Sequence, residues 1–506
     1  MEMNTANVIG EGSYGCVHKP SLKCKETKIK GKPIDYSNQV SKVLINKEAI
    51  KEMSEYVLIK NIDKNNDFYL GEPIHCKVNN KDDYNKRSIQ KCKNGVEIQK
   101  GMSKDYSLII MKDGGLNLAD YSEKVEKLSV TPENKEKMEK FWIEGHRMIR
   151  GIKAFLNHGF IHHDMKPQNV VYNETDNRLN FIDFGLVQNK RNIIKDSKNT
   201  KYWFGRFWWS FPPEIFFLNK NIFDEMSKLE NMERVRIFNN TLNEFKNPNT
   251  TDELAYALQG FIPYIESLKK KTEYYYSLQI LFRDGFKEDY SEFLDKCIDT
   301  IDIYGLGFSF LYLLSKSNHL MDASLMSDLE SLFFSMMTPN YIDRIDIDNL
   351  LNLYEFLLKK HGLLTKYGYV FDNHILKKTG QKYSSAVSTG NIDSPVSHEI
   401  AKQIDEIANT PSIVTDKIKK MISTELTPCP DDEIMNSNRM CVKKQRITKK
   451  VIDCTEDQER NPNTGRCVKK CKRGQRRNPF FICVGPVLSA KIRGGKRRNN
   501  TKKQRR

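Results

Sequence analysis

The sequence lacks long apolar runs: in all 506 residues, none approaches the roughly 20 residues needed to cross a bilayer. The longest lies near 307–314. The first ten residues, MEMNTANVIG, also lack the basic stretch and apolar stretch that mark a secretory signal. We therefore expect an intracellular protein with no transmembrane helix and no membrane partner.

The cysteines lack the C-x₂-C spacing of common zinc modules. Of the 11 cysteines, six lie in three repeats that start at Cys429, Cys454 and Cys471, each with two cysteines 12 or 13 residues apart. Six cysteines allow 15 disulfide pairings. Pairing within each repeat is the simplest, with zinc ligation or free thiols as alternatives. The other five are scattered, and an intracellular protein would keep them reduced: Cys16, Cys24, Cys76, Cys92 and Cys297.

An excess of positive over negative charge is scarce outside the last part of the chain. The net charge is +17, yet residues 425–506 hold 23 Lys or Arg against 8 Asp or Glu, a net +15. The first 424 residues are therefore close to neutral, which argues against a nucleic-acid-binding body. The basic tail predicts an acidic partner, a nucleic acid or a nuclear-localisation role for that segment alone.

Hydrophobic periodicity divides the chain into a β-rich part, 1–112, and a mostly helical part, 113–365. Strands are expected at 7–17, 39–44, 69–75 and 107–111, and helices at 47–61 and 132–157. A Ser-, Thr- and Gly-containing stretch predicts a linker at 366–424, followed by the cysteine repeats at 425–483 and a disordered basic end at 484–506. The predicted fold class is α+β.

Two motifs in the β-rich part indicate phosphate binding. VIGEGSYGCV places Gly10, Gly12 and Gly15 after a strand, where backbone N–H groups approach phosphate without a Cβ clash. A flexible hairpin turn has a similar composition, so this motif alone is weak. Lys42 lies in an alternating β run, and Glu55 in the following helix is the acid we expect to pair with it. Glu52, one helical turn earlier, is the alternative.

The stretch FIHHDMKPQNVV carries Asp164, Lys166 and Asn169 in a loop, and NFIDFGL delivers Asp183 nineteen residues after Asp164. A base, a lysine and two metal ligands are the set that phosphoryl transfer to a hydroxyl needs. A zinc site at His162 and His163 is the competing interpretation. It is disfavoured because further ligands are not evident.

These motifs resemble the eukaryotic-type protein kinase family from Ile9 to about Gly362. The resemblance implies a two-lobed fold that uses ATP and Mg²⁺, with Asp164 as catalytic base, Lys166 near the transferred phosphate, and Asn169 and Asp183 as metal ligands. Pro212, Pro213 and Glu214 resemble the end of an activation segment, Asp302 the acid that braces the catalytic loop, and Arg344 a partner of Glu214. It implies a nucleotide site at Ile9, Gly10, Gly12, Ser13, Gly15, Val17, Lys42, Glu55 and Met111.

Lys166 two residues after the base resembles the serine/threonine branch, so the expected activity is transfer of phosphate to Ser or Thr of a protein substrate. A pseudokinase scaffold that recruits partners through the tail, and a small-molecule kinase, are the alternatives. The tail repeats resemble two-cysteine adaptor segments of large nucleocytoplasmic DNA viruses. This resemblance implies a divergent viral kinase, located in the host cytoplasm or virion, with a nuclear location as the alternative.

The sequence departs from the family at two places. A helix-like segment, about 218–298, separates Glu214 from Asp302 by 88 positions, and we expect it to shape substrate choice or to be a solvated decoration. His163 replaces an arginine that would pair with an activation-segment phosphate.

The change to His163 predicts activity without activation-segment phosphorylation. Alanine at Ser197, Thr200 and Tyr202 together should leave phosphate transfer within about threefold of wild type, because imidazole cannot copy a bidentate guanidinium–phosphate pair. Transfer assays on the triple variant check this. Abolished activity in a variant that still binds ATP would refute the idea.

Overall fold

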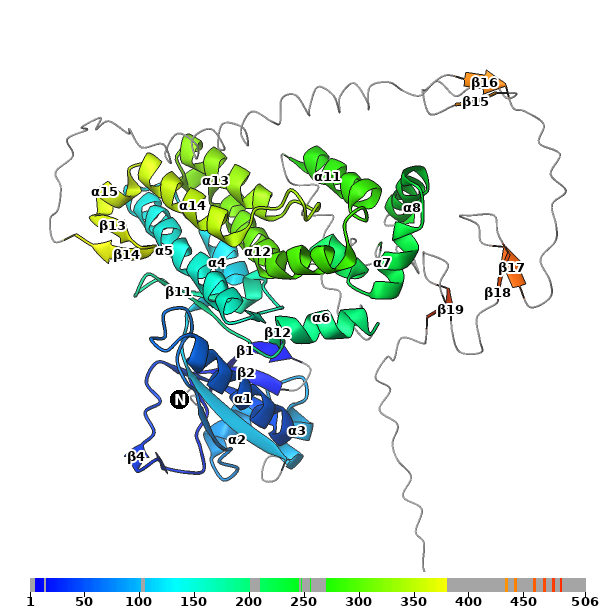
Figure 1. Ribbon diagram of the computed structural model, residues 1–506. Coiled ribbons are helices and arrows are strands. Elements are labelled where there is room, and N and C mark those ends of the chain that lie inside the picture. Colours follow the sequence, from blue (N-terminus) through cyan, green and yellow to red (C-terminus); the bar gives the residue numbers. More distant parts are fainter. Residues whose placement is uncertain are drawn as a thin grey trace, which may run out of the picture.

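The computed structural model describes residues 5–12, 15–101, 105–200, 210–244, 247, 255 and 270–379, together with six short strands between 433 and 484. Ser13 of the predicted nucleotide site, Tyr202, most of the predicted linker and the basic end lie outside the described residues. The described body has a sheet region, residues 5–112, and a helical region, residues 113–379, which lie on either side of the site described below (Figure 1).

The sheet region is built on five antiparallel strands in the order β1-β2-β5-β7-β6. The predicted strands are largely confirmed, except that the run at 69–75 is a strand only from Ile74; Tyr69 instead forms an isolated bridge with Phe181. A small hairpin, β3 (Lys28–Ile29) and β4 (Lys32–Pro33), stands apart from the sheet. The strands of the sheet are β1 (Asn7–Gly12), β2 (Gly15–Lys19), β5 (Gln39–Ile45), β6 (Ile74–Lys77) and β7 (Tyr106–Lys112).

Both faces of this sheet are covered by helices. Helix α1 (Asn46–Ile62) packs on one face, where Ala49 meets Leu44 and Ile109. Helices α2 (Asp83–Ile89) and α3 (Gly95–Gly101) pack on the other face, in a cluster with Val43, Leu108 and Ile110. Side chains alternate across a strand, so residues 43 and 44 face opposite helices. Sequence analysis anticipated α1 but missed α2 and α3, which are too short for a clear period.

Two disulfides lie in the sheet region, which corrects the expectation of reduced cysteines. Cys16 is joined to Cys92 and Cys24 to Cys76, with Cα atoms 6.3 and 5.8 Å apart. The partners are 76 and 52 residues apart in sequence, so spacing could not reveal them. Cys297 is buried and free, and burial raises the pKa of its thiol.

The helical region is organised around two long helices, α5 and α12. The prediction of a helix from Pro132 to Asn157 is confirmed by α5, which begins with Pro132 at its first position and Thr131 accepting a hydrogen bond from the Asn134 N–H. The other helices are α4 (Leu118–Val125), α6 (Lys190–Lys198), α7 (Lys220–Ser227), α8 (Asn231–Glu244), α11 (Lys271–Asp284), α13 (Ala323–Met336), α14 (Ile347–Lys360) and α15 (Leu363–Tyr367).

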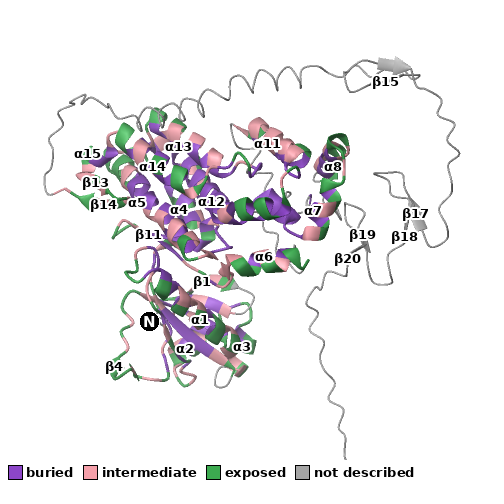
Figure 2. Ribbon diagram, viewed as in Figure 1, coloured by how far each residue is buried: buried purple, intermediate pink, exposed green. Residues whose placement is uncertain are grey.

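Helix α12 (Tyr290–Ser317) is the centre of the core of the helical region. Among the described residues it contributes to the one helical span, Tyr290–Leu320, that is long and apolar enough to cross a membrane, but 89% of the most apolar window is buried inside the protein. Figure 2 shows this burial along α12 and the adjoining α4 and α5. Its apolar residues are thus accounted for by packing against α4, α5 and α13.

Short strands and 3₁₀ turns hold the loops that face the sheet region. Strand β10 pairs with both β8 and β11, and β9 pairs with β12, so the loop from β9 to β10 is fixed at both ends. These elements are β8 (Leu116–Asn117), β9 (Phe160–Ile161), β10 (Val170–Asn173), β11 (Arg178–Phe181), β12 (Gln188–Asn189), and the turns η1 (Pro167–Asn169), η3 (Pro213–Phe217) and η4 (Asn318–Leu320).

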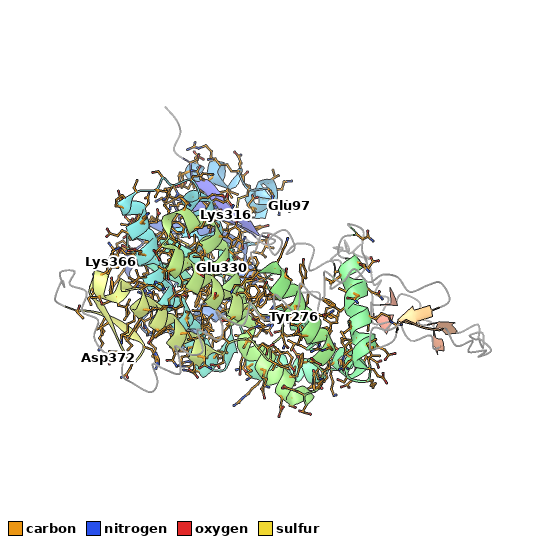
Figure 3. All side chains as sticks on the ribbon, turned by 90° about the horizontal axis from the view of Figure 1, so that it is seen from above. Glu97, Tyr276, Lys316, Glu330, Lys366 and Asp372 are labelled. Atoms are coloured by element: carbon orange, nitrogen blue, oxygen red, sulfur yellow. A yellow bond between two sulfur atoms is a disulfide. The ribbon has the colours of Figure 1, made fainter. Side chains whose placement is uncertain are left out.

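The first part of the predicted linker is folded. Residues 369–378 form a hairpin of β13 (Tyr369–Asp372) and β14 (Ile375–Lys378), and the Nδ1 of His374 in its turn donates a 2.9 Å hydrogen bond to the Glu355 carboxylate of α14. Lys366 and Asp372 lie at one edge of the protein in Figure 3. The linker prediction was wrong for this stretch because serine- and glycine-rich composition begins only after it.

Each of the three predicted cysteine repeats contains a two-stranded antiparallel hairpin. The second strand of each hairpin begins at the second cysteine of its repeat, at Cys441, Cys467 and Cys483. The hairpins are β15 (Glu433–Met435) with β16 (Cys441–Lys443), β17 (Gln458–Arg460) with β18 (Cys467–Lys469), and β19 (Arg476–Arg477) with β20 (Cys483–Val484). The state of the six cysteines stays a prediction.

Candidate active site

The Asp302 side chain of α12 holds the loop between β9 and β10 in place. Its carboxylate accepts hydrogen bonds from the backbone N–H of His162 at 2.6 Å and of His163 at 2.9 Å. Asp302 is 1% exposed, so these bonds form away from water. The predicted bracing by Asp302 is confirmed, and it fixes the backbone two residues before Asp164.

Asp164, Lys166 and Asn169 converge on one another. The Lys166 ammonium donates to both carboxylate oxygens of Asp164, at 2.9 and 2.8 Å, and the Asn169 amide nitrogen donates to the Asp164 Oδ2 at 2.7 Å. Burial raises the pKa of Asp164, although the charge and hydrogen bond of Lys166 oppose the shift. The carboxyl group is therefore oriented and more basic than a free one, as a group that accepts a hydroxyl proton must be.

Asp183 enters the same site from the end of β11. The Ile182 N–H donates to the Asn169 carbonyl at 3.0 Å, which ties the two loops together. Asp183 has a positive φ of 60° and its side chain is exposed, without a hydrogen bond to any described residue. Phe184, the next residue, is 1% exposed and packs on Tyr56 of α1. The buried Phe184 ring therefore anchors the backbone next to the exposed Asp183 carboxylate.

Lys42 pairs with Glu52 and not with Glu55, which corrects the first choice of sequence analysis. The Lys42 Nζ lies 2.8 Å from the Glu52 Oε2, whereas Glu55 makes its ion pair with Lys51, at 3.8 Å. Burial alone would lower the pKa of Lys42, but the charges of Glu52 and Asp183 outweigh burial, so the pKa is raised. The lysine is thus held as a cation near Asp183.

Replacing Glu52 with glutamine should weaken Mg²⁺-nucleotide binding about tenfold, since a charge-assisted hydrogen bond that orients Lys42 contributes roughly 1.5–3 kcal/mol. Glu55→Gln is the matched control on the same helix and should change affinity less than about threefold. Titration with an ATP analogue compares the two. A larger loss in the Glu55 variant would reverse the assignment.

The raised pKa of Glu55 predicts that the stability of the protein depends on pH. Burial, with the charges of Glu52 and Asp183, raises its pKa from 4.5 to about 7. A raised carboxyl pKa contributes stability that is present below pH 4.5 and lost as pH rises through about 7. Glu55→Gln should therefore be more stable than wild type by about 1–2 kcal/mol at pH 8, after allowance for solvent screening, and nearly equal at pH 4.5.

Unfolding midpoints of both proteins at the two pH values measure this difference. Glu97→Gln, on the exposed face of α3, provides the control for loss of one negative charge. A stability gain that does not change with pH would contradict the assignment to Glu55.

The glycine-rich hairpin, β1 and β2, lies beside β5, the strand that carries Lys42. Val17 and Lys42 are cross-strand partners and so point to the same face of the sheet. Gly15 passes so close to β5 that a Cβ would lie 1.7 Å from the Val43 carbonyl oxygen, which only glycine permits. Ile9 is 50% exposed at a register shift between Val8 and Gly10.

Met111 lies on β7 opposite Val40 and receives a 3.3 Å hydrogen bond at its sulfur from Tyr56. Tyr56 therefore contacts both Met111 and Phe184, and links α1 to β7 and to the loop that carries Asp183. Sequence analysis did not single out Tyr56. Its position four residues after Glu52, on the same helix face, is the signal that could have found it.

His162 and His163 are scaffold residues in this loop. Burial lowers the pKa of His162, whose Nε2 lies 3.2 Å from the Ile182 carbonyl and whose ring packs on Phe184. His163 has φ 62° and stacks on Phe211, with ring centres 5.2 Å apart. Among the described residues, the groups of three or more metal-ligating side chains include neither histidine. The packing favours scaffolding over a zinc site.

The predicted partnership of Glu214 and Arg344 is confirmed. Both side chains are fully buried, and the Arg344 Nη2 lies 2.9 Å from the Glu214 Oε2 in a two-pronged pair. Arg344 also donates to Thr300 and to the Thr338 carbonyl. The pair ties the segment that contains Glu214 to α12 and to the loop before α14.

The donor set fits a divalent cation and nucleotide phosphates. Asn169 uses its amide nitrogen on Asp164, and its carbonyl oxygen and the exposed Asp183 carboxylate are oxygen donors of the kind that Mg²⁺ prefers. Lys42 supplies a point charge of the kind that binds phosphate. Lys42 comes from β5 of the sheet region. Asp164 and Asn169 come from the loop between β9 and β10, and Asp183 follows β11, in the helical region.

Comparison with known families gives one match. Residues 121–207 match the model of the ABC1 atypical kinase-like domain. The matched segment contains Asp164, Lys166, Asn169 and Asp183, and it covers less than a fifth of the chain. This part of the protein has a kinase-like fold. No curated protein matches the chain.

Proposed function

We propose that this protein is a two-lobed protein kinase that transfers the γ-phosphate of ATP to a serine or threonine hydroxyl of a protein substrate. The single observation that carries the proposal is that Asp164, Asn169, Asp183 and Lys42 lie close enough to interact with one another, inside and beside the kinase-like segment. Phosphoryl transfer depends mostly on positioning and charge stabilisation, and this set provides both.

Each residue has a distinct role in this proposal. Asp164 orients the acceptor hydroxyl and takes its proton, and Lys166 stabilises charge on the transferred group. Lys42, held by Glu52, and the backbone of the glycine-rich hairpin hold the nucleotide phosphates. Asn169 and Asp183 would hold Mg²⁺, which neutralises the charge that develops between the β- and γ-phosphates.

The helices after Glu214, the basic tail and the cysteine repeats support the proposals for substrate choice, partner and viral origin. Helices α7, α8 and α11 follow Glu214 and would select protein substrates. Helices α7 and α11 contact α12, and α8 packs on α11. The basic tail would recruit an acidic protein or a nucleic acid. The cysteine repeats support a viral kinase that acts in the host cytoplasm or virion.

Analysis of the labelled product tests the acceptor. The purified protein, γ-labelled ATP, Mg²⁺ and a generic basic protein should yield phosphoserine or phosphothreonine in the acid hydrolysate. Label confined to phosphotyrosine would contradict the proposed specificity. Label found only on small molecules would favour a small-molecule kinase, and nucleotide binding with no transfer would favour a scaffold.

A further inference from the structure

The turn between α2 and α3 contacts the glycine-rich hairpin, β1 and β2, on the face of the sheet opposite the Lys42 side chain. Glu11 of β1 and Cys16 of β2 are cross-strand partners, and they point away from the face that carries Val17 and Lys42. Cys92 in the turn is joined to Cys16, and the backbone N–H of Lys93 donates to the Glu11 Oε1 at 2.7 Å. Two consecutive turn residues therefore hold both strands of the hairpin.

Further contacts attach α2 and the α2–α3 turn to the start of β1. Ser88 of α2 accepts a 2.9 Å hydrogen bond from the Ala6 N–H, and Lys91 donates to Thr5 at 2.7 Å and to the Ala6 carbonyl at 3.1 Å. Lys93 adds an ion pair with Glu11 at 3.5 Å, which is exposed on the lysine side and worth little. The covalent link is thus the strongest element of the attachment.

We propose that the α2–α3 turn is a clamp that positions the glycine-rich hairpin for nucleotide, and that the Cys16–Cys92 disulfide, formed during folding, closes it. The effect of the clamp on nucleotide binding rests on the proposed function, because it takes nucleotide as the ligand of the hairpin. Closure converts two thiols to one disulfide. Two electrons and two protons pass to a disulfide-bearing oxidant, which leaves as two thiols.

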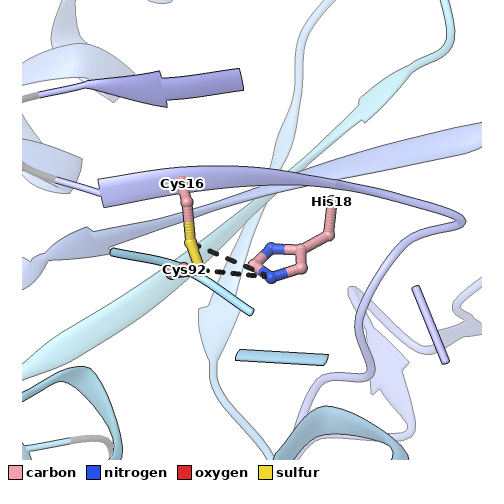
Figure 4. Close-up of side chains that lie close together, drawn as sticks. All are labelled: Cys16, His18 and Cys92. Carbon is pink, nitrogen blue, oxygen red and sulfur yellow. Dashed lines mark hydrogen bonds between the residues drawn. A yellow bond between two sulfur atoms is a disulfide. The ribbon is translucent and has the colours of Figure 1, made fainter. Parts of the chain in front are cut away.

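The surroundings of His18 indicate that the Cys16–Cys92 disulfide is a permanent cross-link and not a reversible switch (Figure 4). Its Nε2 lies 3.5 Å from the Cys92 sulfur and 3.8 Å from the Cys16 sulfur, and burial lowers its pKa to about 4. A neutral imidazole does not supply the cation that would stabilise a thiolate, and both cysteines are buried. Exchange in the folded protein should therefore be slow, so the link persists once formed.

The same three side chains could hold a metal if the cysteines were reduced, since their ligand atoms lie within 4.8 Å of one another. Structural zinc sites use four protein ligands, whereas this group has three within the part of the chain that the structure describes. Three-ligand sites keep a position open to water or substrate, yet all three side chains here are buried. A disulfide fits these residues better than a metal.

A peptide map tests whether the Cys16–Cys92 disulfide forms, and it needs no activity assay. The full-length protein, refolded with oxidised and reduced glutathione and digested without reductant, should give linked peptides that contain Cys16 and Cys92 and that separate on reduction. Free thiols at both positions, or one zinc ion per chain that depends on Cys16 and Cys92, would overturn the cross-link.

Affinity for Mg²⁺ and an ATP analogue tests the clamp. The double variant Cys16→Ala, Cys92→Ala should bind about tenfold more weakly, as expected if the released hairpin keeps its binding position about a tenth of the time. Cys24→Ala, Cys76→Ala removes the other disulfide and is the matched control, with a loss below about threefold. Equal losses in the two double variants would overturn the clamp.

Glu11→Ala provides a second route if the first double variant does not fold. It removes the Lys93 contact but leaves the disulfide, and it should raise hydrogen exchange in β1 and β2 while affinity falls by less than in the Cys16, Cys92 variant. Unchanged exchange in β1 and β2 would contradict the clamp. A wild-type protein that binds no nucleotide would overturn the proposed function and the clamp's nucleotide role, and the peptide map would still decide the disulfide.

Discussion

Arg344→Met is expected to lower the unfolding free energy of the helical region by about 3–5 kcal/mol, because it leaves the Glu214 carboxylate buried without its counter-charge. Both side chains of the pair are fully buried. The variant also loses the hydrogen bonds of Arg344 to Thr300 and Thr338 and its contact with the Tyr304 ring. A loss of this size corresponds to a fall in unfolding midpoint of roughly 10 °C for a region of this length.

Thermal unfolding followed by circular dichroism measures the change. Arg283→Met is the matched control, because Arg283 also pairs with a carboxylate, that of Asp284, but at the surface with 45% of its side chain exposed. That variant should lose less than about 1 kcal/mol. Adding Glu214→Gln to Arg344→Met should recover part of the loss. Similar midpoints for the Arg344 and Arg283 variants would contradict the account of the buried pair.

Asp183→Asn is expected to lower the rate of phosphate transfer at least about a thousandfold and to remove the Mg²⁺ dependence of nucleotide binding. Asparagine keeps the shape but not the charge, and metal-assisted stabilisation of a phosphoryl transition state contributes several kcal/mol, with about 1.4 kcal/mol for each factor of ten. Stability should change little, since the side chain is exposed and makes no hydrogen bond to the described residues.

Nucleotide affinity with Mg²⁺ and with a chelator, together with single-turnover rates, tests this prediction. Asp176→Asn, an exposed aspartate in the turn between β10 and β11, provides the control and should behave as wild type. If the Asp183 variant retained metal-dependent binding, Asp183 would not be a metal ligand.

The catalytic loop was predictable because its chemistry is local in sequence. Asp164, Lys166 and Asn169 lie within six residues, and a loop that short must bring them together wherever it lies in the fold. Their hydrogen bonds in the structure agree with this expectation. Long-range partnerships such as Glu214 with Arg344 came from the resemblance to kinases, since nothing in the sequence between them indicates contact.

The choice between Glu52 and Glu55 needed the structure. Helix α1 carries apolar residues on both faces, with Ile50 and Val57 exposed and Ala49 and Ile59 buried. Periodicity therefore could not show which face meets the sheet. Packing of the buried face decides the rotation of the helix, and that rotation turns Glu52 to Lys42.

The disulfides were missed for a different reason. Cys16 and Cys92 meet only because α2 and α3 cover the outer face of the sheet, and these helices gave no signal of their own. Composition indicated an intracellular chain, which led to the expectation of free thiols. The contact depends on tertiary structure and could not be derived from cysteine spacing.

Our main proposal is that residues brought together from the sheet region and the helical region transfer phosphate from ATP to protein. Its most direct test incubates wild type and Asp164→Ala with γ-labelled ATP, Mg²⁺ and a generic basic protein, after nucleotide binding has been verified for both. The account predicts labelled protein with wild type and a loss of label of at least about a thousandfold with the variant. Equal labelling by the two proteins, or no labelling by wild type that binds nucleotide, would contradict it.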